Sequence, residues 1–138
     1  MTNKITRRTA RESAVKLVFA HSINNEENAE EFYTLAVAEH EIAANDFTRS
    51  LFFGALENKE KIDEAISAHA SGWKMSRISK MSLAIMRVCT YELLFTDVPK
   101  EIAINEAVEI AKAYDNDGAP AFINGILNSV SKAKGVAE

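Results

Sequence analysis

The chain has 138 residues, 47% of them hydrophobic, and a net charge of −4, which is ordinary for a globular protein that can bury a core of its own. Five glycines and two prolines are too few for an all-β chain built on turns, and a single cysteine excludes an internal disulfide. The sequence shows no apolar signal segment and no membrane span, so we expect a cytoplasmic protein with no membrane partner.

The charges are distributed unevenly along the chain. Residues 1–16 contain five basic residues and one acidic residue, a balance of +4, so residues 17–138 carry −8. A basic N-terminal segment on an acidic body suggests that an anionic partner, such as a nucleic acid, binds at that end.

Thr6 is a suitable N-cap for a first helix that runs to about His21. With 100° of rotation per residue, the side chains of this helix fall into two neighbouring arcs, one apolar and one that begins with basic residues. The basic arc can be either a face exposed to solvent or a nucleic-acid-binding surface. The apolar arc, predicted to be buried, comprises Ala10, Ala14, Leu17, Val18 and His21. The arc predicted to be exposed is basic and then apolar, and comprises Lys4, Arg7, Arg8, Arg11, Val15 and Phe19.

Capping residues mark the helices that follow. Asn28 begins a capping-box pattern and predicts a second helix that ends near Glu41. Asn45 caps the next stretch, whose apolar residues recur at helical spacing. This stretch exceeds the usual length of a helix, so we expect two helices that meet near Asn58.

The stretch 81–95 is predicted to be the central helix of the fold. Arg87 and Glu92 are its only charged residues, and nearly all the others are apolar. A helix that is apolar on every side must be surrounded by protein, so the other helices should pack around it. Ser76 or Ser79 is its predicted cap.

Two further helices are predicted after the central one. Pro99 stops the central helix and suits the first turn of another that runs through Tyr114. After a turn at 115–118, a last helix ends near Lys132. No segment shows the alternation of a strand, so the predicted fold class is all-α with about seven helices.

We expect no enzyme activity, no cofactor and no metal. His21, His40 and His69 lack metal-ligand spacing, and Cys89 lies inside the apolar central helix. The turn 115–118 resembles a calcium loop but lacks the ligands in the required register. The sequence contains none of the common phosphate-binding, dinucleotide-binding or nucleophile motifs.

Several segments together resemble the NusB family of bacterial transcription antitermination factors. The resemblance covers residues 6–20 and 76–130, whereas residues 23–70 agree only in helical pattern. The segments that carry it are RRTARESAV at 7–15, MRV at 86–88, YEL at 91–93, VPKEIAINEAVEIAK at 98–112 and FINGIL at 122–127.

The resemblance implies a single all-α domain of two small bundles, about 1–70 and about 76–133, around the central helix. It implies a factor without catalysis that binds a boxA-type sequence in single-stranded nascent RNA jointly with NusE, a ribosomal small-subunit protein. That assembly joins other factors on RNA polymerase and lets it pass terminators, notably during ribosomal RNA synthesis. Whether the chain also forms a homodimer stays open.

The resemblance also implies which residues bind RNA. Arg7, Arg8 and Arg11 would contact the RNA backbone, with Phe122 and Asn124 on the same surface. On general grounds, arginines position phosphates, and a ring such as that of Phe122 stacks on an unpaired base. A core position for Phe122 and a helix-end role for Asn124 stay open as alternatives.

For NusE, the resemblance implies a surface formed by Phe19 and the exposed side of the central helix near Ser82 and Arg87. Two departures from the family pattern are expected to weaken RNA binding. Thr9 stands where some members carry arginine, and the acidic turn 115–118 would repel phosphate if it lies at the RNA face. Two other functions stay open. One is an RNA-recognition module related to the N-terminal domain of RNA methyltransferases, which the short chain disfavours, and the other is a helical protein–protein adaptor.

Overall fold

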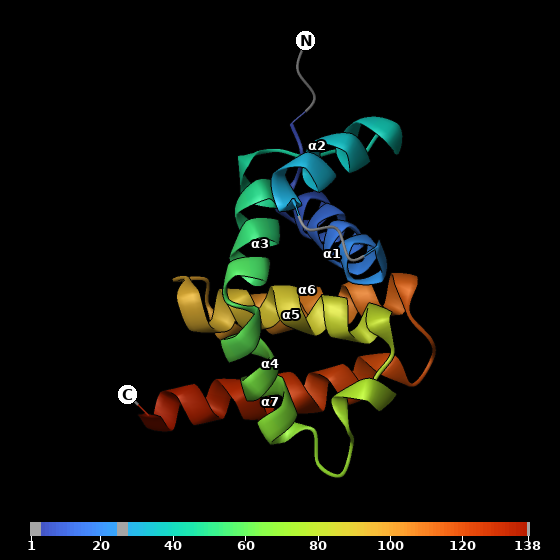
Figure 1. The fold of residues 1–138 in the computed structure, drawn as a ribbon. Helices are drawn as coiled ribbons and strands as arrows, with labels where there is room; N and C mark the ends of the chain where they lie inside the picture. The colour runs from blue at the N-terminus through green and yellow to red at the C-terminus, as the bar shows by residue number, and fades with distance from the viewer. Residues whose placement is uncertain (1–3, 25–27, 138) are drawn as a thin grey trace.

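The computed structural model describes residues 4–24 and 28–137, with side chains as far as residue 134. Within these ranges the chain forms seven α-helices, one short 3-10 helix and no strand (Figure 1), so the all-α prediction is confirmed. The elements are α1 (Arg7–Asn24), α2 (Ala29–Glu39), α3 (Asp46–Glu57), α4 (Lys59–His69), η1 (Met75–Arg77), α5 (Lys80–Phe95), α6 (Lys100–Tyr114) and α7 (Ala119–Ala137).

Several helices start where short polar side chains satisfy their first backbone N–H groups. The start of α3 is a complete capping box, in which the side chains of Asn45 and Thr48 each accept the backbone N–H of the other residue. Helices α3 and α4 meet at Asn58, as predicted. Three further predicted caps are confirmed, since Thr6, Asn28 and Ser79 each accept the N–H of the residue three positions later.

Helix α5 is the centre of the fold. It packs against α1, α3, α4, α6 and α7 and crosses the middle of the ribbon in Figure 1. Ten of its 16 residues are buried, and Ile85 and Met86 are 1% and 0% exposed. The prediction that this apolar helix is enclosed by the others is therefore confirmed.

The expected division into two bundles, about 1–70 and about 76–133, stays a prediction. A boundary near residue 70 groups α4 with the three helices before it. In the structure α4 packs mainly against α5 and α7, so we propose a boundary between α3 and α4. The buried apolar residues of both parts form one continuous core around α5.

Helix α7 continues to Ala137, beyond the predicted end near Lys132. The Lys134 Nζ donates a hydrogen bond of 2.6 Å to the carbonyl oxygen of Leu93, so a contact with α5 holds the last turns. No local sequence signal announces such a tertiary contact. Among the described residues, no helix combines the length and apolar character needed to cross a bilayer.

Gly54 in α3 lies so close to the ring of Tyr91 in α5 that a side chain does not fit. A Cβ at residue 54 would lie 2.2 Å from the Cζ of Tyr91. We expect Gly54→Ala to lower the free energy of unfolding by about 1–3 kcal/mol, because the ring must leave its place. When Tyr91→Ala has already removed the ring, Gly54→Ala should lower the free energy of unfolding much less. Urea denaturation of the parent, the two single variants and the double variant measures this difference.

Gly125 in α7 provides the matched control. It is a helical glycine, and a Cβ there would have no neighbour within 4 Å. Gly125→Ala should be neutral or stabilise the protein by up to about 1 kcal/mol, because alanine is the better helix former. Equal losses at residues 54 and 125 would contradict the proposed conflict with Tyr91.

Candidate nucleic-acid interface

The buried face of α1 is wider than the predicted arc. Because α1 packs against both α3 and α5, its buried side chains span about 200° of the helix circumference. Arg11 and Val15, which were predicted on the exposed arc, are only 6% and 2% exposed, so that part of the prediction is wrong. The basic residues of the arc that remain exposed are Lys4, Arg7 and Arg8.

Arg11 is held by a buried carboxylate of α5. Its Nε and Nη2 atoms each donate to one oxygen of Glu92 at 2.9 Å, and the two side chains are 7% and 1% exposed. Burial lowers the pKa of Arg11, but the hydrogen bonds and the charge of Glu92 outweigh it and leave the pKa raised. Arg11 therefore ties α1 to α5, and its donors are not free for a phosphate.

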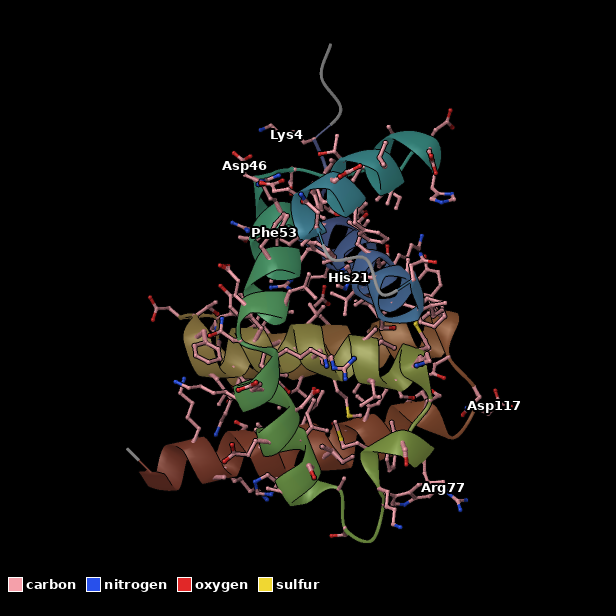
Figure 2. All side chains as sticks on the ribbon, in the orientation of Figure 1. Lys4, His21, Asp46, Phe53, Arg77 and Asp117 are labelled. Carbon is pink, nitrogen blue, oxygen red and sulfur yellow. The ribbon has the colours of Figure 1, made fainter. Side chains whose placement is uncertain are left out.

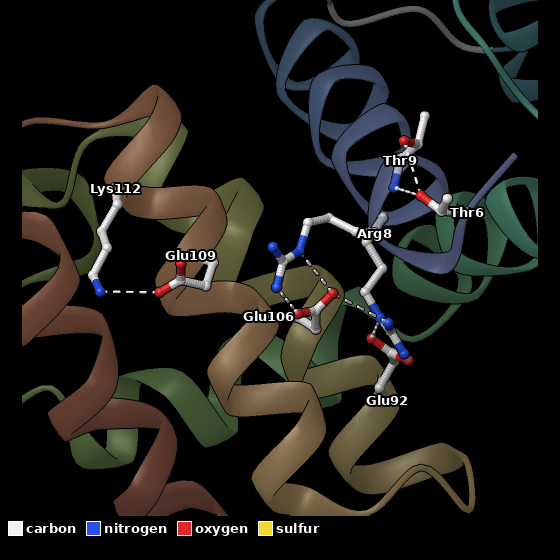
Figure 3. A network of polar contacts seen from close by, with 8 residues as sticks. Thr6, Arg8, Thr9, Glu92, Glu106, Glu109 and Lys112 are labelled. Atoms are coloured by element: carbon white, nitrogen blue, oxygen red, sulfur yellow. Dashed lines mark hydrogen bonds and ion pairs between the residues drawn. The ribbon is translucent and has the colours of Figure 1, made fainter.

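Arg8 lies on the surface and is paired with α6 (Figure 3). Its Nε donates to Glu106 Oε1 at 3.2 Å, and its Nη2 donates to the other carboxylate oxygen. These hydrogen bonds lower the pKa of Glu106 below its ordinary value. Because the Arg8 side chain is 51% exposed, a phosphate can reach it in competition with Glu106.

Arg7 is the arginine of α1 that is most accessible to a ligand. It is exposed, and its Cζ lies 4.0 Å from the ring centroid of Phe47 in α3. Within the described part of the chain Arg7 forms no ion pair. An arginine that rests on an aromatic ring keeps its N–H donors available at the edge of the guanidinium group, where a phosphate binds.

Phe122 and Asn124 do not face the same way. They are two residues apart on α7 and therefore point about 200° apart around the helix. Phe122 is partly buried against Trp73, with ring centroids 5.5 Å apart and planes at 67°. Asn124 is exposed, and both its backbone and side-chain oxygens accept hydrogen bonds from Asn128. Phe122 and Asn124 lie on different sides of α7, and a joint contact of both residues with RNA stays a prediction.

Lys16 and Tyr114 form a second basic and aromatic contact, which sequence reasoning missed. Lys16 is exposed on α1, and its Nζ lies 5.0 Å from the ring centroid of Tyr114 at the end of α6. Beyond Tyr114 the chain turns at 115–118 and enters α7, which carries Phe122. The contact arises from tertiary packing, so neither residue carried a local signal.

The predicted partner surface is less exposed than expected. Ser82 is 4% exposed and donates to Asp115 at 2.6 Å, so its placement on an exposed side of the central helix is wrong. Arg87 donates to both oxygens of Asp63 in α4, at 2.8 and 3.0 Å. Phe19 is partly buried and packs against the core instead of standing free.

A basic hollow lies beside Arg87. It is lined by Lys59 at the start of α4, by Lys80 at the start of α5 and by Arg87 itself, with Ser22 of α1 on another side. Asp63 offsets part of this positive charge, because it pairs with Arg87 and its Oδ2 also lies 3.7 Å from the Lys59 Nζ. The contribution of this place to partner binding stays a prediction.

The described residues contain no group of three or more potential ligands placed to hold a metal. Cys89 is buried in α5, where burial and then the charge of Glu92 raise the pKa of its thiol far above the usual value. A thiol that stays protonated is a poor nucleophile, so Cys89 acts as a small apolar core residue.

Comparison with known proteins relates these residues to a family. The NusB family model matches residues 8–132. The chain belongs to the NusB family. It is 41% identical to a transcription antitermination protein NusB of Clostridium novyi, with 94% of this chain and 100% of that protein aligned. It is 38% identical to a protein of the same name from Campylobacter jejuni, with 94% and 98% aligned.

Solved NusB structures have the same fold. A structure of T. maritima NusB superimposes with a TM-score of 0.81 at 33% identity, covering 94% of this chain and 93% of that one. A crystal structure of the antitermination factors NusB and NusE in complex with double-stranded RNA gives a TM-score of 0.80 at 26% identity, covering 92% and 96%. The match to the NusB family includes residues 23–70, where only the helical pattern had agreed.

Proposed function

We propose that this NusB-family chain is a transcription antitermination factor that binds RNA jointly with NusE and acts on RNA polymerase. The observation that supports this most is its similarity to NusB in the solved complex of NusB, NusE and RNA. The finer proposal is that it binds a boxA-type sequence in nascent ribosomal RNA and helps the polymerase pass terminators. Such a role requires no catalysis and places the protein in the cytoplasm.

In this proposal, RNA binding begins at the first turn of α1. Arg7, supported by Phe47, contacts a phosphate directly, and Arg8 does so by exchanging Glu106 for the phosphate. Arg11 positions α1 on α5 and does not touch RNA. The two proposed residues of α7 act separately: Phe122 provides a ring for stacking, and Asn124 contributes only where the strand bends around α7.

We propose single-stranded RNA as the ligand, because stacking on Phe122 requires an unpaired base. The solved complex of NusB and NusE contains double-stranded RNA, so both forms belong in the experiment. We propose that NusE binds around Phe19 and the basic hollow at Arg87, while Ser82 acts indirectly by holding Asp115. A homodimer that covered the first turn of α1 would compete with RNA.

Fluorescence anisotropy with labelled RNA and a transcription assay together test the function. We expect boxA-type single-stranded RNA to bind more tightly than a scrambled strand, and NusE to tighten that binding further. Adding the chain with NusE should increase read-through of a terminator by RNA polymerase. Absence of RNA binding and of read-through, with NusE still bound, would favour a protein–protein adaptor. Sequence-independent RNA binding without NusE or read-through would favour an RNA-recognition module.

Arg7→Gln should make RNA binding less dependent on salt. Each phosphate neutralised on a single strand contributes about −0.7 to the slope of log K against log salt, so the slope should flatten by about 0.7. Lys61→Gln in α4 is the control. Lys61 is exposed on a helix far from α1 in sequence, and its substitution also removes one positive charge. Equal slopes for the two variants would show that Arg7 is only solvated surface.

A further inference from the structure

Trp73 is exposed beside the ring that is proposed to stack on RNA. It is the only tryptophan of the chain, and it lies in the loop between α4 and η1 with 54% of its surface exposed. Its ring meets Phe122 edge to face at 5.5 Å. A large aromatic surface held open by a second ring is typical of a place where a flat ligand binds.

Both rings line a hollow of about 310 Å³. Its walls come from three separate segments: the loop and η1 with Trp73 and Arg77, the cap of α5 at Ser79, and the turn and first residues of α7 with Asn116 and Phe122. This volume is at the lower end of the range for ligand sites, which suits one planar ring and not a protein helix.

The rim of the hollow carries hydrogen-bond donors. Arg77 is exposed in η1, and Figure 2 shows it on the outer side of the molecule at the end where Asp117 lies. The Asn116 Oδ1 accepts the N–H groups of Gly118 and Ala119, both at 3.1 Å, so its Nδ2 amino group is the part that a ligand can use. Carbonyl and phosphate oxygens are the groups that complement these donors. Asp115 and Asp117 flank Asn116 in the same turn and oppose a phosphate, so the donors must outweigh them.

We propose that this hollow holds one unpaired base of the RNA against Trp73 and Phe122, while Arg77 binds the adjoining phosphate. The inference rests on the proposed RNA binding and names a stacking position within it. An edge-to-face pair of rings leaves the face of one ring open, and a base stacked there is sequence-tolerant because every base has a π-face. Asn116 donates to a carbonyl oxygen of that base and thereby favours a base that carries one.

The fluorescence of Trp73 reports directly on this site in the unmodified protein. The full chain with NusE is titrated with boxA-type single-stranded RNA and with a set of strands that each lack one base. We expect binding of the intact strand to quench the fluorescence of Trp73. One abasic strand should bind about 5- to 150-fold more weakly and leave the fluorescence unquenched, because the lost base is the one that stacks.

Three variants assign the roles. Trp73→Leu should bind the intact strand about 5- to 150-fold more weakly, with an unchanged salt slope. This variant should bind the strand that lacks the stacked base as tightly as the intact strand, because the stack is already lost. Arg77→Gln should flatten the salt slope by about 0.7. Phe95→Leu, a change at an exposed ring stacked on Tyr91 elsewhere on α5, should leave RNA binding unchanged. Thermal melts verify that all three variants fold.

The outcomes separate this inference from the proposed function. If RNA binds and NusE tightens it, but Trp73 fluorescence stays constant and Trp73→Leu binds like the parent, the stacking site is overturned and the function stands. If no RNA binds with NusE present, both are overturned. If each abasic strand loses as much affinity for Trp73→Leu as for the parent, Trp73 contacts no particular base. The stacking site is then overturned as well.

Discussion

Arg11→Ala should lower the free energy of unfolding by about 3–5 kcal/mol. The substitution leaves the carboxylate of Glu92, which is 1% exposed, without the two N–H donors that now satisfy it. A buried ion without a partner must take up a proton or draw water into the interface between α1 and α5, and both cost free energy. Urea denaturation followed by circular dichroism measures the loss.

Two controls isolate the buried pair. Arg8→Gln, one turn earlier on α1, should lower the urea midpoint much less than Arg11→Ala. Arg8 is 51% exposed, and Glu106, although 12% exposed, keeps Arg11 at 3.8 Å and can bond the new amide or water. Arg11→Met combined with Glu92→Leu should regain most of the stability, because an apolar pair needs no hydrogen bonds. This double variant should also keep the parent's salt dependence of RNA binding. A midpoint for Arg11→Ala equal to that of Arg8→Gln would contradict the burial of the pair.

Ile85→Ala should lower the free energy of unfolding by about 2–5 kcal/mol, a large part of the stability of a domain of this size. Ile85 is 1% exposed in the middle of α5, where helices pack on nearly every side. Truncation removes buried methyl groups and leaves a cavity that so many neighbours cannot all move to fill. The same urea titration measures the effect.

Ile102→Ala provides the matched control for Ile85→Ala. Ile102 is the same residue type in the neighbouring helix α6, but it is 50% exposed. Its truncation removes methyl groups that already contact water, so the change should stay within about 0.5 kcal/mol. A loss under about 1 kcal/mol for Ile85→Ala would show that α5 is not enclosed as described.

Local features were predictable from the sequence, because they depend on interactions over three or four residues. The capping side chains Thr6, Asn28, Asn45 and Ser79 each bond an N–H three positions along the chain, and all four were predicted. The enclosure of α5 was also predictable, since a helix that is apolar all round has no face to present to water. These signals, together with the segments that resemble the NusB family, determined the fold class and the family.

The site depended on contacts between segments far apart in the sequence. Arg8 and Arg11 are of one residue type on one arc of α1, and periodicity treats them alike. Only the packing of α1 against α5 decides that Arg11 is buried on Glu92 while Arg8 stays at the surface with Glu106.

The same holds for the aromatic hollow. Trp73 and Phe122 belong to elements separated by α5 and α6 in the chain, and no local pattern pairs them. By itself, the sequence determined which residue types were available and which helices they lie on. The tertiary structure alone decided which charges are neutralised and which rings meet, because ion pairs and ring contacts depend on distances of a few ångströms that helical periodicity does not contain.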